Sequence, residues 1–189
     1  MQEIVFPRIY PKNEEQGGYF MKKRLILAMA VLLLLGSLCS CFFKSKEWHP
    51  DDDSIGDAKT FEKAGLTITL TDKFEEQSSQ VGFDAYYVAD FCGVMVLKEE
   101  FTLEEGLAER PLEEYINNVI KNNGRADTVA QQKDGLWFYE YTTSNGNFGR
   151  SYCYKGSDAF YVVQFICRSS DKESLDDMFW SWAHSVKTK

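Results

Sequence analysis

Apolar and polar residues follow a regular pattern from about Thr60 to the end of the chain. The clearest stretch is Gly65–Thr71, where leucine and isoleucine occupy every second position and threonines fill the others. Such strict alternation is typical of a half-buried β-strand. Phe83–Val88 and Phe91–Leu97 are two more apolar runs, separated by only two residues, and they predict a hairpin. The first half of this region therefore predicts β-structure.

Two later segments carry apolar residues at helical spacing. Pro111 predicts the start of a helix, since proline favours the first turn, and Gly124 predicts its end. Asp171–Val186 is a second amphipathic segment, with one apolar stripe. The stripe consists of Leu175, Met178, Phe179, Trp182 and Val186.

A meander of strands is expected between these helices. The expected strands are 127–133, 136–143, 148–155 and 160–168. Asn145-Gly146 is a strong hairpin signal, and Ser157-Asp158 predicts a second tight turn. Strands joined by hairpins form antiparallel sheets, so the order of elements predicts an α+β fold, an antiparallel β-sheet with helices packed on it.

The turn at Asn145-Gly146 decides which aromatic residues share a face of this sheet. If the turn contains two residues, five aromatic residues come together on one face. They are Trp137, Tyr139, Tyr141, Tyr152 and Tyr154. This set is a candidate binding platform for a sugar, a peptide or a protein partner. The alternative, which we favour, is burial of both faces beneath helices, because aromatic cross-strand pairs stabilise sheets without any ligand. A shift of one residue in the turn would change these partnerships.

The N-terminal region has a different pattern. Three basic residues, 22–24, precede the apolar run Leu25–Leu35, and small residues and a cysteine follow. This is the order of a secretory signal peptide, here residues 21–41. The ending Leu38-Cys39-Ser40-Cys41 resembles the lipobox of bacterial lipoproteins, which implies that Cys41 is acylated and becomes the mature N-terminus. Cys39 is the weaker lipidation candidate, because the bulky Leu38 would stand at its cleavage position.

An uncleaved membrane anchor is the other interpretation, since Leu25–Phe43 is long and apolar enough to span a bilayer. Both interpretations place the bulk of the chain outside the cytoplasm, because the positive cluster stays inside. Residues 1–20 fit neither the lipoprotein signal nor the membrane anchor. Gln16-Gly17-Gly18 can be encoded by a purine-rich ribosome-binding sequence before Met21, so we expect residues 1–20 to be a mis-annotated, untranslated leader.

The remaining chain divides into an acidic flexible tether, residues 42–59, and a single globular domain, residues 60–189. The chain has 21 basic and 29 acidic side chains, a net charge of −8, and the signal segment holds three of the bases. This acidic balance argues against a nucleic-acid partner. The expected partners are the membrane, through the N-terminal lipid, and an envelope protein or small ligand that the sequence does not identify.

Cysteine usage excludes a disulfide scaffold. Of the five cysteines, Cys92, Cys153 and Cys167 follow the signal segment, so at most one internal bridge can form. The expected register points Cys153 and Cys167 to opposite faces, which predicts that these two do not pair. Asp51, Asp53, Gly56 and Glu62 match four places of an EF-hand calcium loop, but Ile55 stands where an oxygen ligand is needed and the flanks are not helical, so we favour an acidic tether. The sequence contains no phosphate-binding loop, no zinc-protease motif and no nucleophile-elbow motif, so we expect no metal, no cofactor and no catalytic residue.

A family resemblance rests on the segment G-L-T-I-T-L-T-D-K-F (Gly65–Phe74), followed by a central helix, an aromatic meander and a terminal helix. Over residues 60–187 this order is similar to the PsbP-like fold, an α/β/α sandwich. The superfamily includes photosystem subunits of the thylakoid lumen, a Ran-binding transport protein and DcrB-like bacterial lipoproteins. The resemblance implies a non-enzymatic binding or assembly module. A solute- or glycan-binding lipoprotein is the alternative, and an envelope hydrolase is less favoured.

Overall fold

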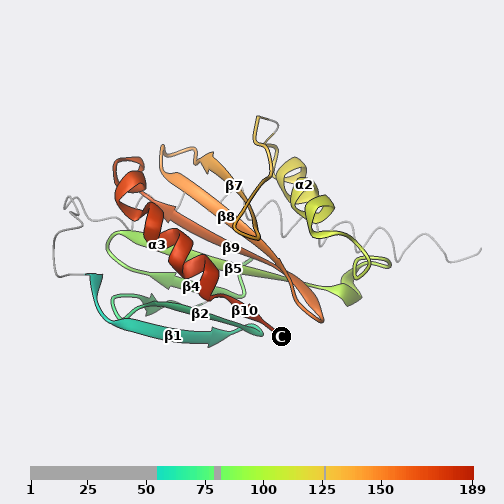
Figure 1. Ribbon diagram of the computed structural model, residues 1–189, viewed down its shortest axis with the longest axis horizontal. Helices are drawn as coiled ribbons and strands as arrows, with labels where there is room; N and C mark the ends of the chain where they lie inside the picture. The colour runs from blue at the N-terminus through green and yellow to red at the C-terminus, as the bar shows by residue number, and fades with distance from the viewer. Residues whose placement is uncertain (1–54, 79–81, 126) are drawn as a thin grey trace, which may run out of the picture.

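The computed structural model describes residues 55–78, 82–125 and 127–189 (Figure 1). The signal segment, Cys41 and most of the tether lie outside these described residues, so the predictions about them stay predictions. The described part forms two antiparallel β-sheets and two α-helices. Ala58 and Lys59, which the sequence assigned to the tether, are already the first residues of a strand.

The larger sheet has seven strands in the order β3-β4-β5-β9-β8-β7-β6. Their bounds are β3 Glu75–Glu76, β4 Ala85–Val88, β5 Cys92–Glu100, β6 Gln131–Lys133, β7 Leu136–Thr142, β8 Phe148–Lys155 and β9 Ala159–Cys167. All neighbours pair antiparallel, which confirms the expected β4–β5 hairpin and the meander. The crossover from β5 to β9 places two strands from distant parts of the chain side by side at the centre.

The smaller sheet contains β1 (Ala58–Lys63), β2 (Leu66–Thr71) and β10 (Lys187–Thr188). The alternating segment predicted from the sequence is β2, and its leucines and isoleucine are buried while two of its threonines are half-exposed. It pairs with β1 and β10 and not with the larger sheet, a separation that the sequence pattern did not indicate.

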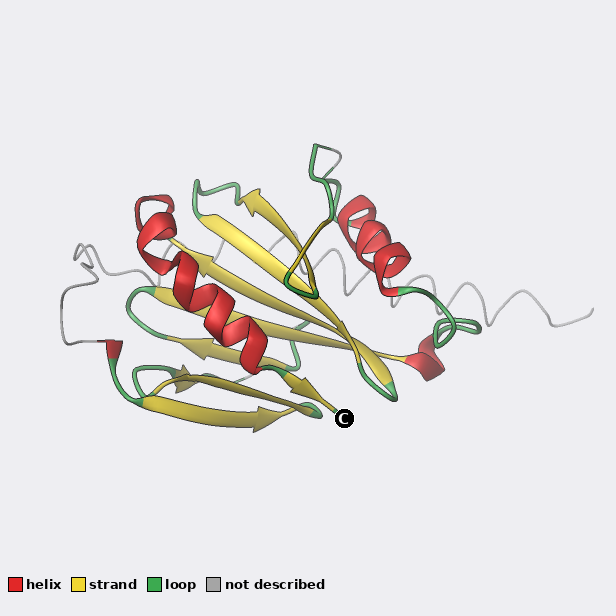
Figure 2. Cartoon of the chain, viewed as in Figure 1, coloured by secondary structure: helices red, strands yellow, loops and turns green. Residues whose placement is uncertain are grey.

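The helices lie on opposite faces of the larger sheet. The first, α2 (Leu112–Asn122), begins after Pro111 and ends before Gly124, whose φ of 65° lets the chain turn out of the helix. Figure 2 shows α3 (Lys172–Ser185) lying diagonally across the strands, beside the smaller sheet. Short 3-10 turns, η3 (Phe101–Leu103) and η4 (Ser169–Asp171), follow β5 and β9.

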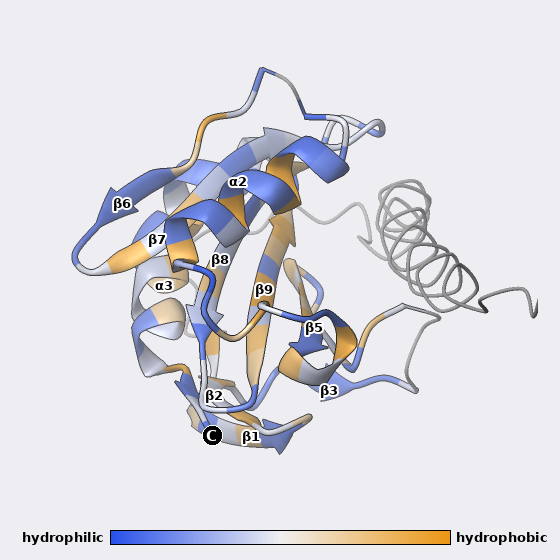
Figure 3. Cartoon of the chain, turned by 90° about the vertical axis from the view of Figure 1, so that its right-hand side faces the viewer, coloured by the Kyte–Doolittle hydropathy of each residue, from blue (hydrophilic) through white to orange (hydrophobic). Residues whose placement is uncertain are grey.

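The core is therefore divided by the larger sheet. One apolar cluster lies between the sheet, α3 and β1–β2, and a second lies between the sheet and α2. Strand β9 is buried over its whole length because it contributes side chains to both clusters, and it is largely apolar in Figure 3. This arrangement confirms the α+β class.

The turn between β7 and β8 differs from the two-residue turn expected at Asn145-Gly146. Thr143 donates its backbone N–H to Asn147 O at 2.8 Å, and Gly146 donates to Thr143 O at 2.9 Å. The loop thus contains three residues, with Gly146 at a φ of 80°. A type I turn followed by a left-handed residue has this form. The expected register of β7 on β8 is wrong by one residue, whereas the two-residue turn at Ser157-Asp158 is confirmed.

Candidate functional site

The five aromatic candidates do not share one face of the sheet. The corrected register pairs Tyr139 with Ser151, and because facing partners share a face, Trp137, Tyr139 and Tyr141 point towards α2. Tyr152 and Tyr154 point the other way, towards α3. The predicted single platform is therefore wrong in its geometry.

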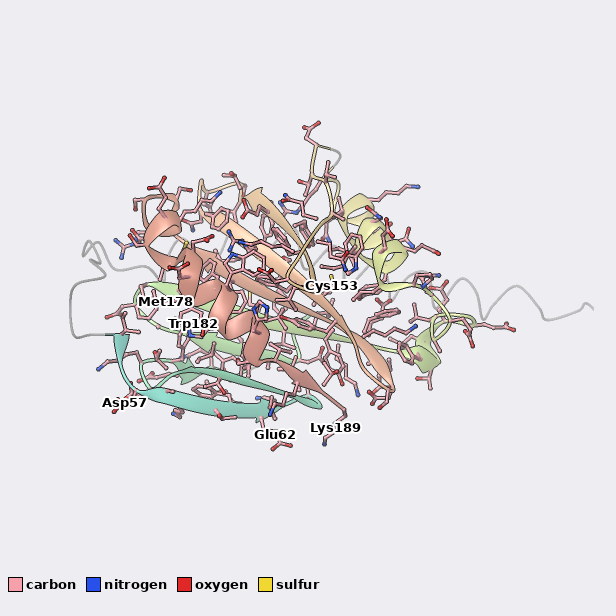
Figure 4. All side chains as sticks on the ribbon, in the orientation of Figure 1. Asp57, Glu62, Cys153, Met178, Trp182 and Lys189 are labelled. Atoms are coloured by element: carbon pink, nitrogen blue, oxygen red, sulfur yellow. The ribbon has the colours of Figure 1, made fainter. Side chains whose placement is uncertain are left out.

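All five side chains pack against other parts of the domain. Tyr139, Tyr141 and Tyr152 are buried, and Trp137 and Tyr154 are half-buried. The Tyr154 hydroxyl donates to the carbonyl of Ala183 in α3 at 2.9 Å, which holds the end of that helix on the sheet. Figure 4 labels two other α3 side chains that pack in this region: Trp182 is buried in the same cluster, and Met178 packs at its edge. These contacts assign the aromatic residues to the core.

A group of charged residues lies beneath α3, and we call it the Arg150 cluster: Arg150, Glu140, Lys172 and Asp176. Arg150 in β8 stands directly opposite Glu140 in β7. Its Nε and Nη2 donate to Glu140 Oε1 at 2.8 and 2.5 Å, and Nη2 also donates to Asp176 Oδ1 at 2.5 Å. Lys172 Nζ donates to Glu140 Oε2 at 3.0 Å. The cluster joins two strands to α3, and its two positive and two negative charges balance.

Aromatic rings surround the Arg150 guanidinium. The central carbon of the guanidinium, Cζ, lies 5.4 to 6.0 Å from the ring centroids of Phe138, Phe148, Phe179 and Trp180. The side chain is only 4% exposed, so the carboxylates replace its lost hydration. Burial alone would raise the pKa of Glu140, but hydrogen bonds from Lys172 and Arg150 outweigh it and hold that pKa below its ordinary value. Glu140 is thus an anionic partner for Arg150 and a poor proton donor near neutral pH.

A second polar group stands at the N-terminal end of α2, around the half-buried Glu99 near the end of β5. Phe160 pairs with Glu99 in the sheet, and the Tyr115 ring stacks on Phe160 at 3.9 Å. Burial raises the pKa of Glu99, and the nearby Tyr115 hydroxyl opposes this only in part. On the other side of Phe160, Lys155 Nζ donates to the carbonyl of Arg110 at 3.0 Å. The aromatic stack therefore has a carboxyl group on one side and an ammonium group on the other.

The three cysteines of the domain are buried thiols. Cys153 belongs to the cluster beneath α2, and Cys167 belongs to the cluster beneath α3. The prediction that these two point to opposite faces is confirmed. Burial raises the pKa of the Cys153 thiol and raises that of Cys167 to about 12. Both are therefore uncharged near neutral pH, and a protonated buried thiol is a poor nucleophile.

Sequence reasoning missed both polar groups. The Glu140–Arg150 pair had a detectable signal, because opposite charges favour direct cross-strand pairing. That pairing alone selects the three-residue loop over the two-residue one. Glu99 had no comparable signal, since its neighbours Tyr115 and Phe160 come from α2 and β9 and meet it only in the folded domain.

No helix in residues 55–78, 82–125 and 127–189 is long and apolar enough to cross a membrane. Within the same ranges, no group of three or more histidine, cysteine, aspartate or glutamate side chains is arranged to hold a metal ion.

Comparison with solved structures identifies the fold. The solution structure of cyanobacterial PsbP (CyanoP) from Synechocystis sp. PCC 6803 aligns with a TM-score of 0.51 at 10% identity, over 77% of this chain and 99% of that chain. The Ran-binding protein Mog1p of Saccharomyces cerevisiae aligns with a TM-score of 0.46 at 11% identity, over 70% and 96%. LpqN of Mycobacterium tuberculosis, involved in cell envelope biogenesis, aligns with a TM-score of 0.38 at 10% identity, over 73% and 88%.

No protein-family model matches the sequence, and neither does a curated protein. At these identities the likeness concerns the fold alone. The alignment with cyanobacterial PsbP covers nearly all of that protein, and the shared architecture is an antiparallel sheet between helices. The domain therefore has a PsbP-like fold, as the order of elements predicted.

Proposed function

We propose that this protein is a lipid-tethered, non-enzymatic binding or assembly module on the outer side of the cell membrane. The observation that carries the proposal is the combination of two parts in one chain. A segment that resembles a lipoprotein signal, ending at Cys41, precedes a domain with a PsbP-like fold. The tether and the lipid supply attachment, and the domain supplies a folded surface. Fold likeness is an analogy about function, and the experiments below test it directly.

The use of side chains inside the domain supports a role based on its surface. The aromatic candidates pack beneath the helices, and the buried Arg150 is held by Glu140 and Asp176. The thiols of Cys153 and Cys167 are buried and protonated. Groups that could bind a sugar or attack a substrate are thus engaged in packing, which favours recognition through the outer faces of the helices and sheets.

Lipidation is tested by metabolic labelling with a fatty acid in a bacterial host. Wild-type protein should incorporate the label and fractionate with membranes, and the Cys41→Ala variant should carry no label and remain an unprocessed or mis-sorted precursor. Cys39→Ala is the matched control, two residues away, and should be labelled like the wild type. If the label persists in Cys41→Ala and disappears in Cys39→Ala, the lipidated residue is Cys39 and the proposed assignment to Cys41 is wrong. Unlabelled wild-type protein in membranes would favour the uncleaved anchor.

Location and assembly need separate measurements. Protease added to intact spheroplasts should degrade the domain, because the proposal places it outside the membrane, and full protection would contradict that location. Chemical cross-linking in cells should give a discrete species above the monomer mass for the wild type. The same species should weaken in Cys41→Ala, which keeps the tether but lacks the lipid. Monomer alone in both proteins would refute the assembly role while leaving lipidation intact.

A further inference from the structure

Two of the buried cysteines face each other on the neighbouring inner strands β5 and β9 of the larger sheet. Cys92 is the first residue of β5 and Cys167 is the last residue of β9, and the antiparallel register pairs them directly. Both belong to the cluster on the α3 side of the sheet, whereas Cys153 belongs to the cluster beneath α2. Among the three thiols of the domain, only this pair occupies facing positions on one side.

The hydrogen-bond pattern defines the type of this pair. The N–H and C=O of a strand residue point to the same neighbour, and the direction alternates along the strand. The backbone N–H of Ala89 donates to Cys92 O at 2.9 Å, so the polar groups of Cys92 point towards β4. Nine residues later, the N–H of Phe101 donates to Asp158 O at 2.9 Å, on the β9 side, as this alternation requires. Cys92 and Cys167 therefore form a non-hydrogen-bonded pair.

This geometry fits a disulfide. Non-hydrogen-bonded partners have Cα atoms about 4.5 Å apart, closer than hydrogen-bonded partners at about 5.5 Å, and their side chains approach most closely. Disulfides join residues whose Cα atoms are about 4.4–6.8 Å apart. The pair also stands at the ends of both strands, where small backbone adjustments disturb few neighbouring bonds. In the structure the Cys92 thiol donates to the carbonyl of Gly93 at 3.5 Å, so a rotation of its side chain precedes bonding.

We propose that Cys92 and Cys167 form an intramolecular cross-strand disulfide when the chain folds under oxidising conditions. One thiol, as its thiolate, attacks a disulfide-bearing oxidant and forms a mixed disulfide. The second thiol then breaks the mixed disulfide by attacking the protein's own sulfur, and the oxidant leaves as a dithiol. When the oxidant is glutathione disulfide, one glutathione thiol leaves in each of the two steps. The two cysteines lose two electrons to the oxidant, and their two protons balance those that its sulfurs accept.

The step must occur before the sheet closes. Both side chains are fully buried in the folded domain, so no oxidant reaches them there. Folding in the extracytoplasmic space would supply oxidant while the thiols are accessible. Formation of the disulfide in the cell therefore rests on the extracytoplasmic location of the proposed function. The ability of Cys92 and Cys167 to pair with each other does not depend on that location.

Oxidative refolding of the full chain tests the pairing. Denatured, reduced protein is refolded in a mixture of reduced and oxidised glutathione, remaining thiols are alkylated under denaturing conditions, and the digest is analysed by mass spectrometry. The expected product is a linked Cys92–Cys167 peptide with Cys153 alkylated. Cys153→Ala is the matched control and should form the same link. Protein folded in its reduced state and only then given oxidised glutathione should stay unlinked at these two positions.

Thermal melting supplies a second readout that needs no peptide assignment. The linked wild type should melt on the order of 10 °C higher than the same protein refolded with reductant, as expected when a long loop is closed. Cys92→Ala should show no such difference, and Cys153→Ala should retain it. Alkylation of both Cys92 and Cys167 after oxidative refolding, or a link through Cys153, would overturn the proposal. If the link forms in the test tube but the protein isolated from cells carries both thiols reduced, the proposed location fails and the pairing stands.

Discussion

The Arg150 cluster offers a sharp test of how charge is accommodated in this core. Glu140→Gln keeps the size of the side chain but removes the negative charge that faces two nitrogens of Arg150. The guanidinium then remains among aromatic rings with Asp176 as its main anionic partner. Breaking a buried ion pair by changing one partner costs about 3–5 kcal/mol. We expect Glu140→Gln to lower the free energy of unfolding by about 2–4 kcal/mol, because Asp176 stays in place and still pairs with Arg150.

The matched variant is Asp176→Asn, which removes the other negative charge. The Asp176 side chain is 41% exposed and accepts one bond from Arg150, whereas Glu140 is 27% exposed and accepts two. Water screens the more exposed pair, so its loss should cost about 1 kcal/mol or less. The free energy of unfolding should therefore fall further in Glu140→Gln than in Asp176→Asn. Urea unfolding at pH 7, followed by tryptophan fluorescence, measures both differences.

A double-mutant cycle separates the ion pair from general packing. In an Arg150→Met background the buried charge is gone and an apolar side chain fills the space between the rings. Glu140→Gln should then cost less than about 0.5 kcal/mol, because the positive group that remains beside it, Lys172, is 42% exposed and screened by water. If Glu140→Gln destabilises both backgrounds equally, or if it leaves the wild type unchanged, the pairing of Arg150 with Glu140 does not stabilise the domain as described.

Three further predictions follow from the same structure. Because the folded-state pKa of Glu140 lies below its ordinary value of 4.5, its contribution to stability is complete above about that pH and is lost as the pH falls through the folded-state pKa. Glu140→Gln should thus flatten the acid side of the stability curve, and an unchanged acid side would contradict this. In urea unfolding, Tyr139→Ala should lower the free energy of unfolding by about 3–5 kcal/mol, and Trp137→Ala, at a half-buried position, by about half as much. Near-wild-type stability of both variants would contradict the burial of these side chains. Gly149→Ala places a Cβ 2.3 Å from the Tyr141 ring and should lower the free energy of unfolding by about 1–3 kcal/mol. The matched variant Gly93→Ala has its nearest atom 3.8 Å away and should change that free energy little. Equal effects of the two variants would refute the close contact at Gly149.

The sequence predicted the elements better than it predicted their partners. Alternation in β2, the proline before α2 and the apolar stripe of α3 are local patterns, and each predicted its element correctly. The turn at Asn145-Gly146 failed because the glycine supplies a left-handed residue to either a two- or a three-residue loop. One residue of difference moved Tyr152 and Tyr154 to the face opposite Tyr139.

Non-local pairings were beyond the sequence pattern. Strand β9 lies beside β5, although α2 and three other strands, β6, β7 and β8, come between them in the chain. The facing positions of Cys92 and Cys167 depend on that crossover, so only the folded structure brings them together. The same holds for Glu99 and Tyr115, which belong to a strand and a helix on opposite sides of a long connection.

The central claim, a lipid-tethered envelope module, is tested most directly by the intact mass of the protein extracted from membranes with detergent. The account predicts a mature chain that begins at Cys41, carries a mass increment for acyl chains, and loses that increment when Cys41 is replaced by alanine. A membrane-bound chain that retains residues 21–40 and carries no lipid would contradict it.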